Sequence, residues 1–170
     1  MSVTNDSIVI AYDGSENARH AIEVAARELG PRHAEVVHAW EPLASATARL
    51  AIYAVAFGGS AGEEVALEAE RARAVADEGA TIARDAGFDA KAVTLRSDGP
   101  VAHAIVEYVA ERAPRLVVMG TRGLSGARSA IAGSVSHHVT QHVHTPVLTV
   151  PPNHAANDQV PAQETEALAG

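Results

Sequence analysis

The sequence of 170 residues predicts an α/β fold: an open sheet of five parallel strands in the spatial order 3-2-1-4-5, with helices on both faces. Strand-like and helix-like segments alternate along the chain and end on a strand. The apolar runs at residues 8–10 and 116–118 are unbroken, as they are in strands that helices cover on both sides. Right-handed connections place the first and fourth strands side by side, and ligands of such sheets bind where these two strands end.

The first unit is a strand followed by a helix. Residues 7–12, SIVIAY, form a short apolar run of strand length. In residues 15–29 apolar side chains recur at helical spacing, and the Gly-Pro pair that follows ends the helix. Ser15 is expected to cap its start.

The second unit contains an interruption. Residues 34–40 give the second strand, and residues 63–86 give a long helix for which Gly87 is the expected C-cap. Residues 42–62 show no clear periodicity and are predicted to form an irregular insertion. This stretch is too apolar for a plain linker, so two interpretations stay open: a lid over a bound ligand, or a disordered surface for a protein partner.

The second half of the chain repeats the alternation. Residues 89–95 are the third strand, residues 100–112 a helix with proline in its first turn, and residues 115–120 the fourth strand. A last helix at 134–143 and a last strand at 146–150 complete the sheet.

Residues 1–151 are therefore expected to form one domain. The tail at 152–170 lacks apolar periodicity and is expected to be disordered.

Composition excludes several classes of protein. The formal net charge is −8 and Lys91 is the only lysine, so the chain lacks the clustered cations of a nucleic-acid binder. No apolar run approaches the roughly 18 residues of a membrane span, and the amino terminus has no signal-peptide pattern, which predicts a cytoplasmic protein without membrane contact. The absence of cysteine excludes disulfides and thiolate metal sites.

The most distinctive stretch is GTRGLSGARSAIAGS, residues 120–134, after the fourth strand. Its glycines allow close backbone approach, so several N–H groups can converge on an anion, and it leads into a helix whose positive N-terminus faces the same point. The hydroxyls of Ser134 and Ser136 add donors, and Arg122 or Arg128 would supply the charge that a phosphate-loop lysine usually gives. Glycine patterns alone are unspecific, so a mobile turn remains the alternative.

This stretch resembles the pattern G-x2-G-x9-G-[S/T] of the nucleotide-binding branch of the universal stress protein family, met by Gly120, Gly123, Gly133 and Ser134. The likeness extends over residues 7–151 and fails mainly in 42–62. It implies a Rossmann-like domain, commonly dimeric, that holds ATP with the adenine end near the first two strands.

The resemblance also implies roles for single residues. Asp13 matches the family acid that contacts the nucleoside, Ala39 falls where the second strand meets the adenine, and Ala11 stands where some members have proline. The residues on ribose and phosphate positions are Met119, Gly120, Arg122, Gly123, Gly133, Ser134 and Val135. From the residues alone, Asp13 has a second interpretation, an Asx turn or a cap at the start of the following helix.

We therefore expect a regulatory stress-response protein that binds ATP, with any Mg²⁺ held through the phosphates. A slow ATPase or a nucleotidyl or phosphoryl transfer enzyme on the same fold is the alternative. Phosphoryl transfer needs an acid that holds a metal, and residues 120–136 contain no Asp or Glu. A backbone cradle does not distinguish ATP from AMP or a cyclic nucleotide.

Two further expectations concern surfaces. His138 and His142 stand at i, i+4, a spacing that can ligate zinc or copper, but no acidic ligand accompanies them, which favours a solvated helix face and no metal site. The last strand, residues 146–150, comes at a sheet edge that would promote aggregation if left uncovered, which predicts a homodimer through pairing of this strand with its twin.

Overall fold

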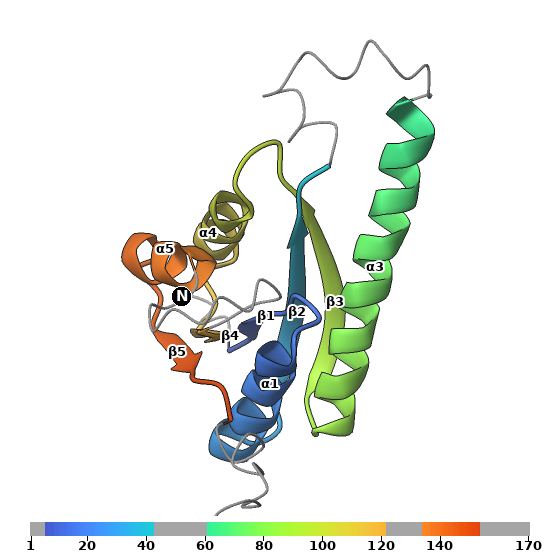
Figure 1. Ribbon diagram of the computed structural model, residues 1–170. Helices are drawn as coiled ribbons and strands as arrows, with labels where there is room; N and C mark the ends of the chain where they lie inside the picture. The colour runs from blue at the N-terminus through green and yellow to red at the C-terminus, as the bar shows by residue number, and fades with distance from the viewer. Residues whose placement is uncertain (1–5, 43–60, 122–133, 154–170) are drawn as a thin grey trace, which may run out of the picture.

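Five parallel strands form one sheet in the computed structural model, which describes residues 6–42, 61–121 and 134–153. The sheet order is β3-β2-β1-β4-β5, and every neighbouring pair is parallel, as the sequence predicts (Figure 1). The strands are β1 (Ile8–Ala11), β2 (His33–Trp40), β3 (Asp89–Arg96), β4 (Leu116–Gly120) and β5 (Val147–Val150). The helices are α1 (Glu16–Leu29), α3 (Ala61–Asp85), α4 (Val101–Arg112) and α5 (Ser134–His142).

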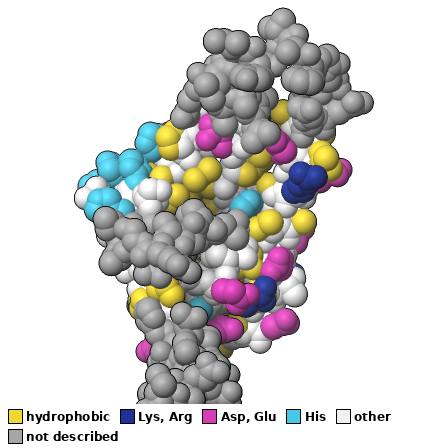
Figure 2. Space-filling view, viewed as in Figure 1, with side chains coloured by type: hydrophobic (Ala, Val, Ile, Leu, Met, Phe, Trp, Pro, Cys, Tyr) yellow, Lys and Arg dark blue, Asp and Glu magenta, His cyan; other side chains and the backbone are white. Residues whose placement is uncertain are grey.

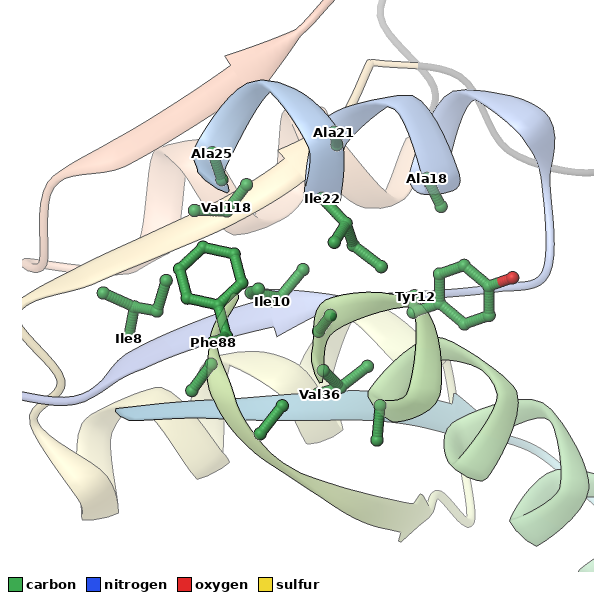
Figure 3. Packing of buried hydrophobic residues seen from close by; sticks show 14 of the residues in the cluster. Ile8, Ile10, Tyr12, Ala18, Ala21, Ile22, Ala25, Val36, Phe88 and Val118 are labelled. Carbon is green, nitrogen blue, oxygen red and sulfur yellow. The ribbon is translucent and has the colours of Figure 1, made fainter. Parts of the chain in front are cut away.

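Helices cover both faces of the sheet. Alternate side chains of a strand point to opposite faces, so Ile8 and Ile10 of β1 pack toward α1 and α3, while Val9 packs toward α4 and α5. Figure 3 shows the first of these clusters, in which Ile22 of α1 and Phe88 before β3 close over the β1 side chains. In the described residues no helix is long and apolar enough to cross a membrane.

Local signals in the sequence explain where α1 and α3 begin and end. The Ser15 hydroxyl accepts a hydrogen bond from the Ala18 N–H at 3.1 Å, which is the predicted cap. Gly87 has a φ of +102°, and the Phe88 N–H reaches back to the Ala83 carbonyl, so the predicted end of α3 is also confirmed. The start of α3 differs: it lies at Ala61, inside the range expected to be irregular, and residues 43–60 lie outside the described residues.

Helix α3 approaches the sheet closely at Gly79. A Cβ added there would lie 2.5 Å from Cδ1 of Tyr12 and 2.9 Å from Cγ1 of Val36. The Tyr12 ring is buried, and its hydroxyl donates to Glu78 at 2.9 Å, while Arg19 of α1 bonds the same carboxylate at 2.7 Å. Burial, together with the hydrogen bond to Glu78, raises the pKa of Tyr12 to about 12. The tyrosine directly before Asp13 is therefore held between α1 and α3.

A buried carboxylate stands in β2 on the opposite face. Glu35 is 7% exposed and accepts from the Tyr108 hydroxyl at 2.7 Å, while Lys91 pairs with it at 2.6 Å and Arg112 at 3.8 Å. Burial alone would raise the pKa of Glu35, but the hydrogen bonds from Lys91 and Tyr108 and the two nearby cations outweigh it and hold the pKa below its ordinary value of 4.5.

Glu35 should make stability depend on acid pH. Because its folded pKa is lowered, its contribution is complete above the unfolded value and is lost as the pH falls through the folded pKa. Glu35→Gln is therefore expected to flatten the loss of stability between neutral pH and about pH 3, measured by urea denaturation. An equal decrease in the free energy of unfolding over this pH range for parent and variant would contradict this account.

Candidate functional site: the crevice between β1 and β4

The carboxyl ends of β1 and β4 lie side by side. The two strands pair in parallel, with Val9 opposite Val117 and Ile10 opposite Val118. β2 continues the sheet on one side of this pair and β5 on the other, so the strand order reverses here. Open parallel sheets bind ligands at such a point, beyond the carboxyl ends of the strands.

On one face of the sheet, the central strands carry small or flexible side chains at their carboxyl ends. Ala11 of β1, Ala39 of β2 and Met119 of β4 all pack on the cluster that faces α4 and α5. Met119 is buried, whereas both alanines are half-buried and extend little beyond the backbone. These three residues, all predicted for the site, therefore lie on a common face at the carboxyl edge of the sheet.

Asp13 stands at the entrance to helix α1. Its Oδ1 accepts a hydrogen bond from the Ser15 N–H at 3.0 Å, across Gly14, whose φ of +84° permits the turn. This contact is the Asx turn that the sequence left as the second interpretation. The side chain is half-buried, and the turn fixes the carboxylate at the edge of the crevice.

Gly120 ends β4 against the first turn of α1. A Cβ added at Gly120 would lie 2.6 Å from Nδ2 and 3.2 Å from the carbonyl carbon of Asn17. The Asn17 amide is buried and donates to the Val150 carbonyl at 3.0 Å. Glycine is thus required at 120 by the packing of a helix on the strand, a reason that its place in the loop pattern did not reveal.

Helix α5 begins on the other side of the crevice. Ser134, its first residue, is exposed, and Val135 packs partly against the α4 and α5 cluster. Ser136 is buried, and its hydroxyl donates to the Thr121 carbonyl at 3.4 Å. The first N–H groups of a helix have no partner within the helix, so this end can receive an anion.

Of the predicted site residues, Arg122, Gly123 and Gly133 lie outside the described residues, as do Gly126 and Arg128. The structure therefore describes Asp13 and the start of α5 but not the glycine-rich stretch between β4 and α5.

Comparison with known proteins identifies the family. The sequence profile of the universal stress protein family matches residues 4–151. The chain belongs to the universal stress protein family. A universal stress protein of Thermus aquaticus is 34% identical over 148 residues, which cover 85% of this chain and 97% of that protein. The Rv1996 universal stress protein of Mycobacterium tuberculosis is 30% identical over 156 residues, but these cover only 49% of its length.

Solved structures, universal stress proteins among them, have the same fold. The hypothetical protein MJ0577, subject of a structure-based assignment of biochemical function, superimposes with a TM-score of 0.67 at 19% identity and covers 89% of this chain and 99% of that one. The protein from Archaeoglobus fulgidus in complex with dAMP gives 0.58 at 22% identity, covering 87% and 99%. A universal stress protein in complex with cAMP gives 0.58 at 23% identity, covering 86% and 97%.

Histidines gather on the flank of this universal stress protein that carries α4 and α5 (Figure 2). The rings of His138 and His142 stack with centroids 4.0 Å apart, and His103 of α4 lies 4.8 Å from His138. Partial burial, followed by repulsion from His142, His103 and His137, lowers the pKa of His138. Among the described residues no group of three or more potential ligands could hold a metal ion, and the absence of a metal site stays a prediction. The expected solvated face is in fact partly packed, because His138 contacts a second helix.

The sequence did not predict a role for Asn17 or the contacts of Tyr12 and His38. His38 Nδ1 lies 2.9 Å from the Tyr12 carbonyl oxygen and so ties β2 to the residue before Asp13. These partners are 26 or more positions apart in the chain, so no local pattern announces them. For Asn17, the helical spacing of the apolar residues indicates only that it stands next to Ala18, which is buried.

Proposed function

We propose that this universal stress protein binds an adenine nucleotide, with ATP as the expected ligand, and acts as a nucleotide-dependent regulator in the cytoplasm. The observation that carries the proposal is that β1 and β4 pair where the strand order reverses, with Asp13 directly after β1 and helix α5 as the next described element after β4. Relatives crystallised with dAMP and cAMP, and one from Arabidopsis thaliana with AMP bound, support the choice of an adenine nucleotide.

The described residues fit the two ends of such a ligand. The side chains of Ala11 and Ala39 extend little beyond the backbone at the carboxyl edge of β1 and β2, which suits a flat base. Asp13 would accept a hydrogen bond from the nucleoside. At the other end, the exposed Ser134 hydroxyl and the first N–H groups of α5 would receive phosphate oxygens. Met119 and Gly120 would lie beneath the ribose, and Val135 and Ser136 would support the start of the helix. Mg²⁺ would be held through the phosphates.

A regulatory role is proposed over a catalytic one. Phosphoryl transfer needs an acid that holds the metal and a group that positions the nucleophile. Asp13 directly follows β1 at the carboxyl edge of the sheet, and its Oδ1 already accepts a hydrogen bond from the Ser15 N–H. Turnover of ATP is expected to stay far below the roughly 1–100 s⁻¹ of kinases. Fast phosphate release abolished by Asp13→Asn would instead favour the enzyme.

The ligand is tested by mass spectrometry of small molecules released from gently purified protein. An adenine nucleotide is expected in the parent and should be depleted in Asp13→Ala, because that variant loses both an acceptor for the nucleoside and the turn that fixes the loop. Glu107→Ala, an exposed carboxylate on α4, is the matched control and should retain the ligand. Recovery of a guanine nucleotide or of an unrelated metabolite would contradict the proposal.

A homodimer through β5 is proposed as the assembly. β5 stands at the end of the described sheet, with β4 on its one paired side, and Val147 and Leu148 remain half-buried. Pairing with a second copy would cover this edge. Leu148→Glu is expected to convert the dimer into a monomer in light scattering, because each copy would place a like charge on the joined strands. A parent protein that is monomeric at all concentrations would refute the dimer.

A further inference from the structure

Asn17 is a buried polar residue whose orientation is fixed by a single contact. It is the second residue of α1 and is 9% exposed. Its Nδ2 donates to the Val150 carbonyl at 3.0 Å, and because a carbonyl oxygen only accepts, this contact determines which end of the amide is the nitrogen. Within the described parts of the chain the opposite atom, Oδ1, is buried without a hydrogen-bond partner. An acceptor left in this way is uncommon and calls for an explanation.

The Val150 carbonyl is the centre of a path across the crevice. It also accepts from the Thr121 N–H at 2.9 Å, and Thr121 directly follows Gly120. The Thr121 carbonyl in turn accepts from the Ser136 hydroxyl at 3.4 Å. Hydrogen bonds thus run from the first turn of α1, through the ends of β5 and β4, to the first turn of α5.

This path joins the two sides of the crevice. Helix α1 follows the loop that holds Asp13, and helix α5 begins with the exposed Ser134. The close contact between Asn17 and Gly120 leaves no space for the amide to move toward β4. The Asn17 amide is therefore one member of the series of hydrogen bonds that connects the start of α1 with the start of α5.

We propose that Asn17 is a positioning residue of the nucleotide site, which through Val150 and Thr121 places the N-terminus of α5 for the phosphates. The lack of a partner for Oδ1 fits this role. The amide is oriented so that Nδ2 donates to the Val150 carbonyl, although this orientation leaves Oδ1 without a hydrogen bond. The inference rests on the proposed function. Because Asn17 acts at the phosphate end, it should affect ATP more than adenosine.

Asn17→Leu tests the inference, because leucine has a similar shape and lacks both the donor and the orphaned acceptor. The Val150 carbonyl keeps the Thr121 N–H, so the thermal midpoint should remain close to that of the parent. Calorimetry should show the affinity for ATP lowered at least about fivefold, the equivalent of one ordinary hydrogen bond, with a smaller loss for adenosine. Tyr108→Phe, in the Glu35 cluster on the other face, should lower stability and leave both affinities unchanged.

Each outcome is decisive. A parent chain that binds neither ATP nor adenosine refutes the proposed function and this inference with it. A parent that binds ATP while Asn17→Leu binds it equally well refutes the inference alone, as does an equal loss for ATP and adenosine. If Asn17→Leu fails to fold, Asn17→Ser, which keeps a shorter donor, is measured in the same way and should show the same preferential loss for ATP.

Discussion

Gly79→Val is expected to destabilise the protein by about 3 kcal/mol or more, the upper range for overpacking a well-packed interior. The first carbon of the new side chain would lie 2.5 Å from the Tyr12 ring and 2.9 Å from Val36. Neither neighbour yields readily, since both are buried and the Tyr12 hydroxyl is bonded to Glu78. Helix α3 would have to move away from β1 and β2, which would also displace the residue before Asp13.

The measurement is urea denaturation beside a matched substitution. Ala74→Val introduces the same side chain into α3 at an exposed position, so it should change stability by no more than about 0.5 kcal/mol. Similar midpoints for Gly79→Val and Ala74→Val would show that the close contact of α3 with Tyr12 is not rigid.

Gly120→Val is expected to lower nucleotide affinity more than about tenfold and stability by about 1–3 kcal/mol. The added side chain meets the Asn17 amide and the backbone of α1, and Asn17 cannot withdraw without losing its hydrogen bond to Val150. Calorimetry with ATP and thermal unfolding of the same samples measure the two effects.

A double substitution separates them. In Gly120→Ala with Asn17→Ala, the methyl group takes the space of the removed amide, so the stability lost in Gly120→Ala should be partly restored. Affinity for ATP should not recover, because the contact with Val150 is absent. Strict additivity of the two stability changes would contradict the proposed clash.

The parts of the fold that sequence analysis predicted correctly depend on local signals. The Ser15 cap and the Gly87 end of α3 rest on neighbours within a few residues, and strands such as β1 show themselves as short apolar runs. The strand order followed from the handedness of connections, which does not depend on side chains. Asp13 was placed at the crevice because it follows β1, and its turn was one of the two interpretations that the residues allowed.

The parts that were missed depend on contacts between distant segments. The sequence marked Gly120 as part of a phosphate loop, but its need for glycine comes from Asn17, which lies on another element. The partners Tyr12 and Glu78 are 66 positions apart, and Asn17 and Val150 are 133 apart. Such pairs become neighbours only when the sheet order brings their elements together, so periodicity does not reveal them.

Isothermal titration of the 170-residue chain with ATP, beside GTP at the same concentrations, tests the central claim most directly. We expect a saturable heat with one ATP bound per chain, and weaker binding of GTP because the proposed ligand is an adenine nucleotide. The absence of measurable heat with ATP and with AMP, from protein shown to be folded and free of bound nucleotide, would contradict it.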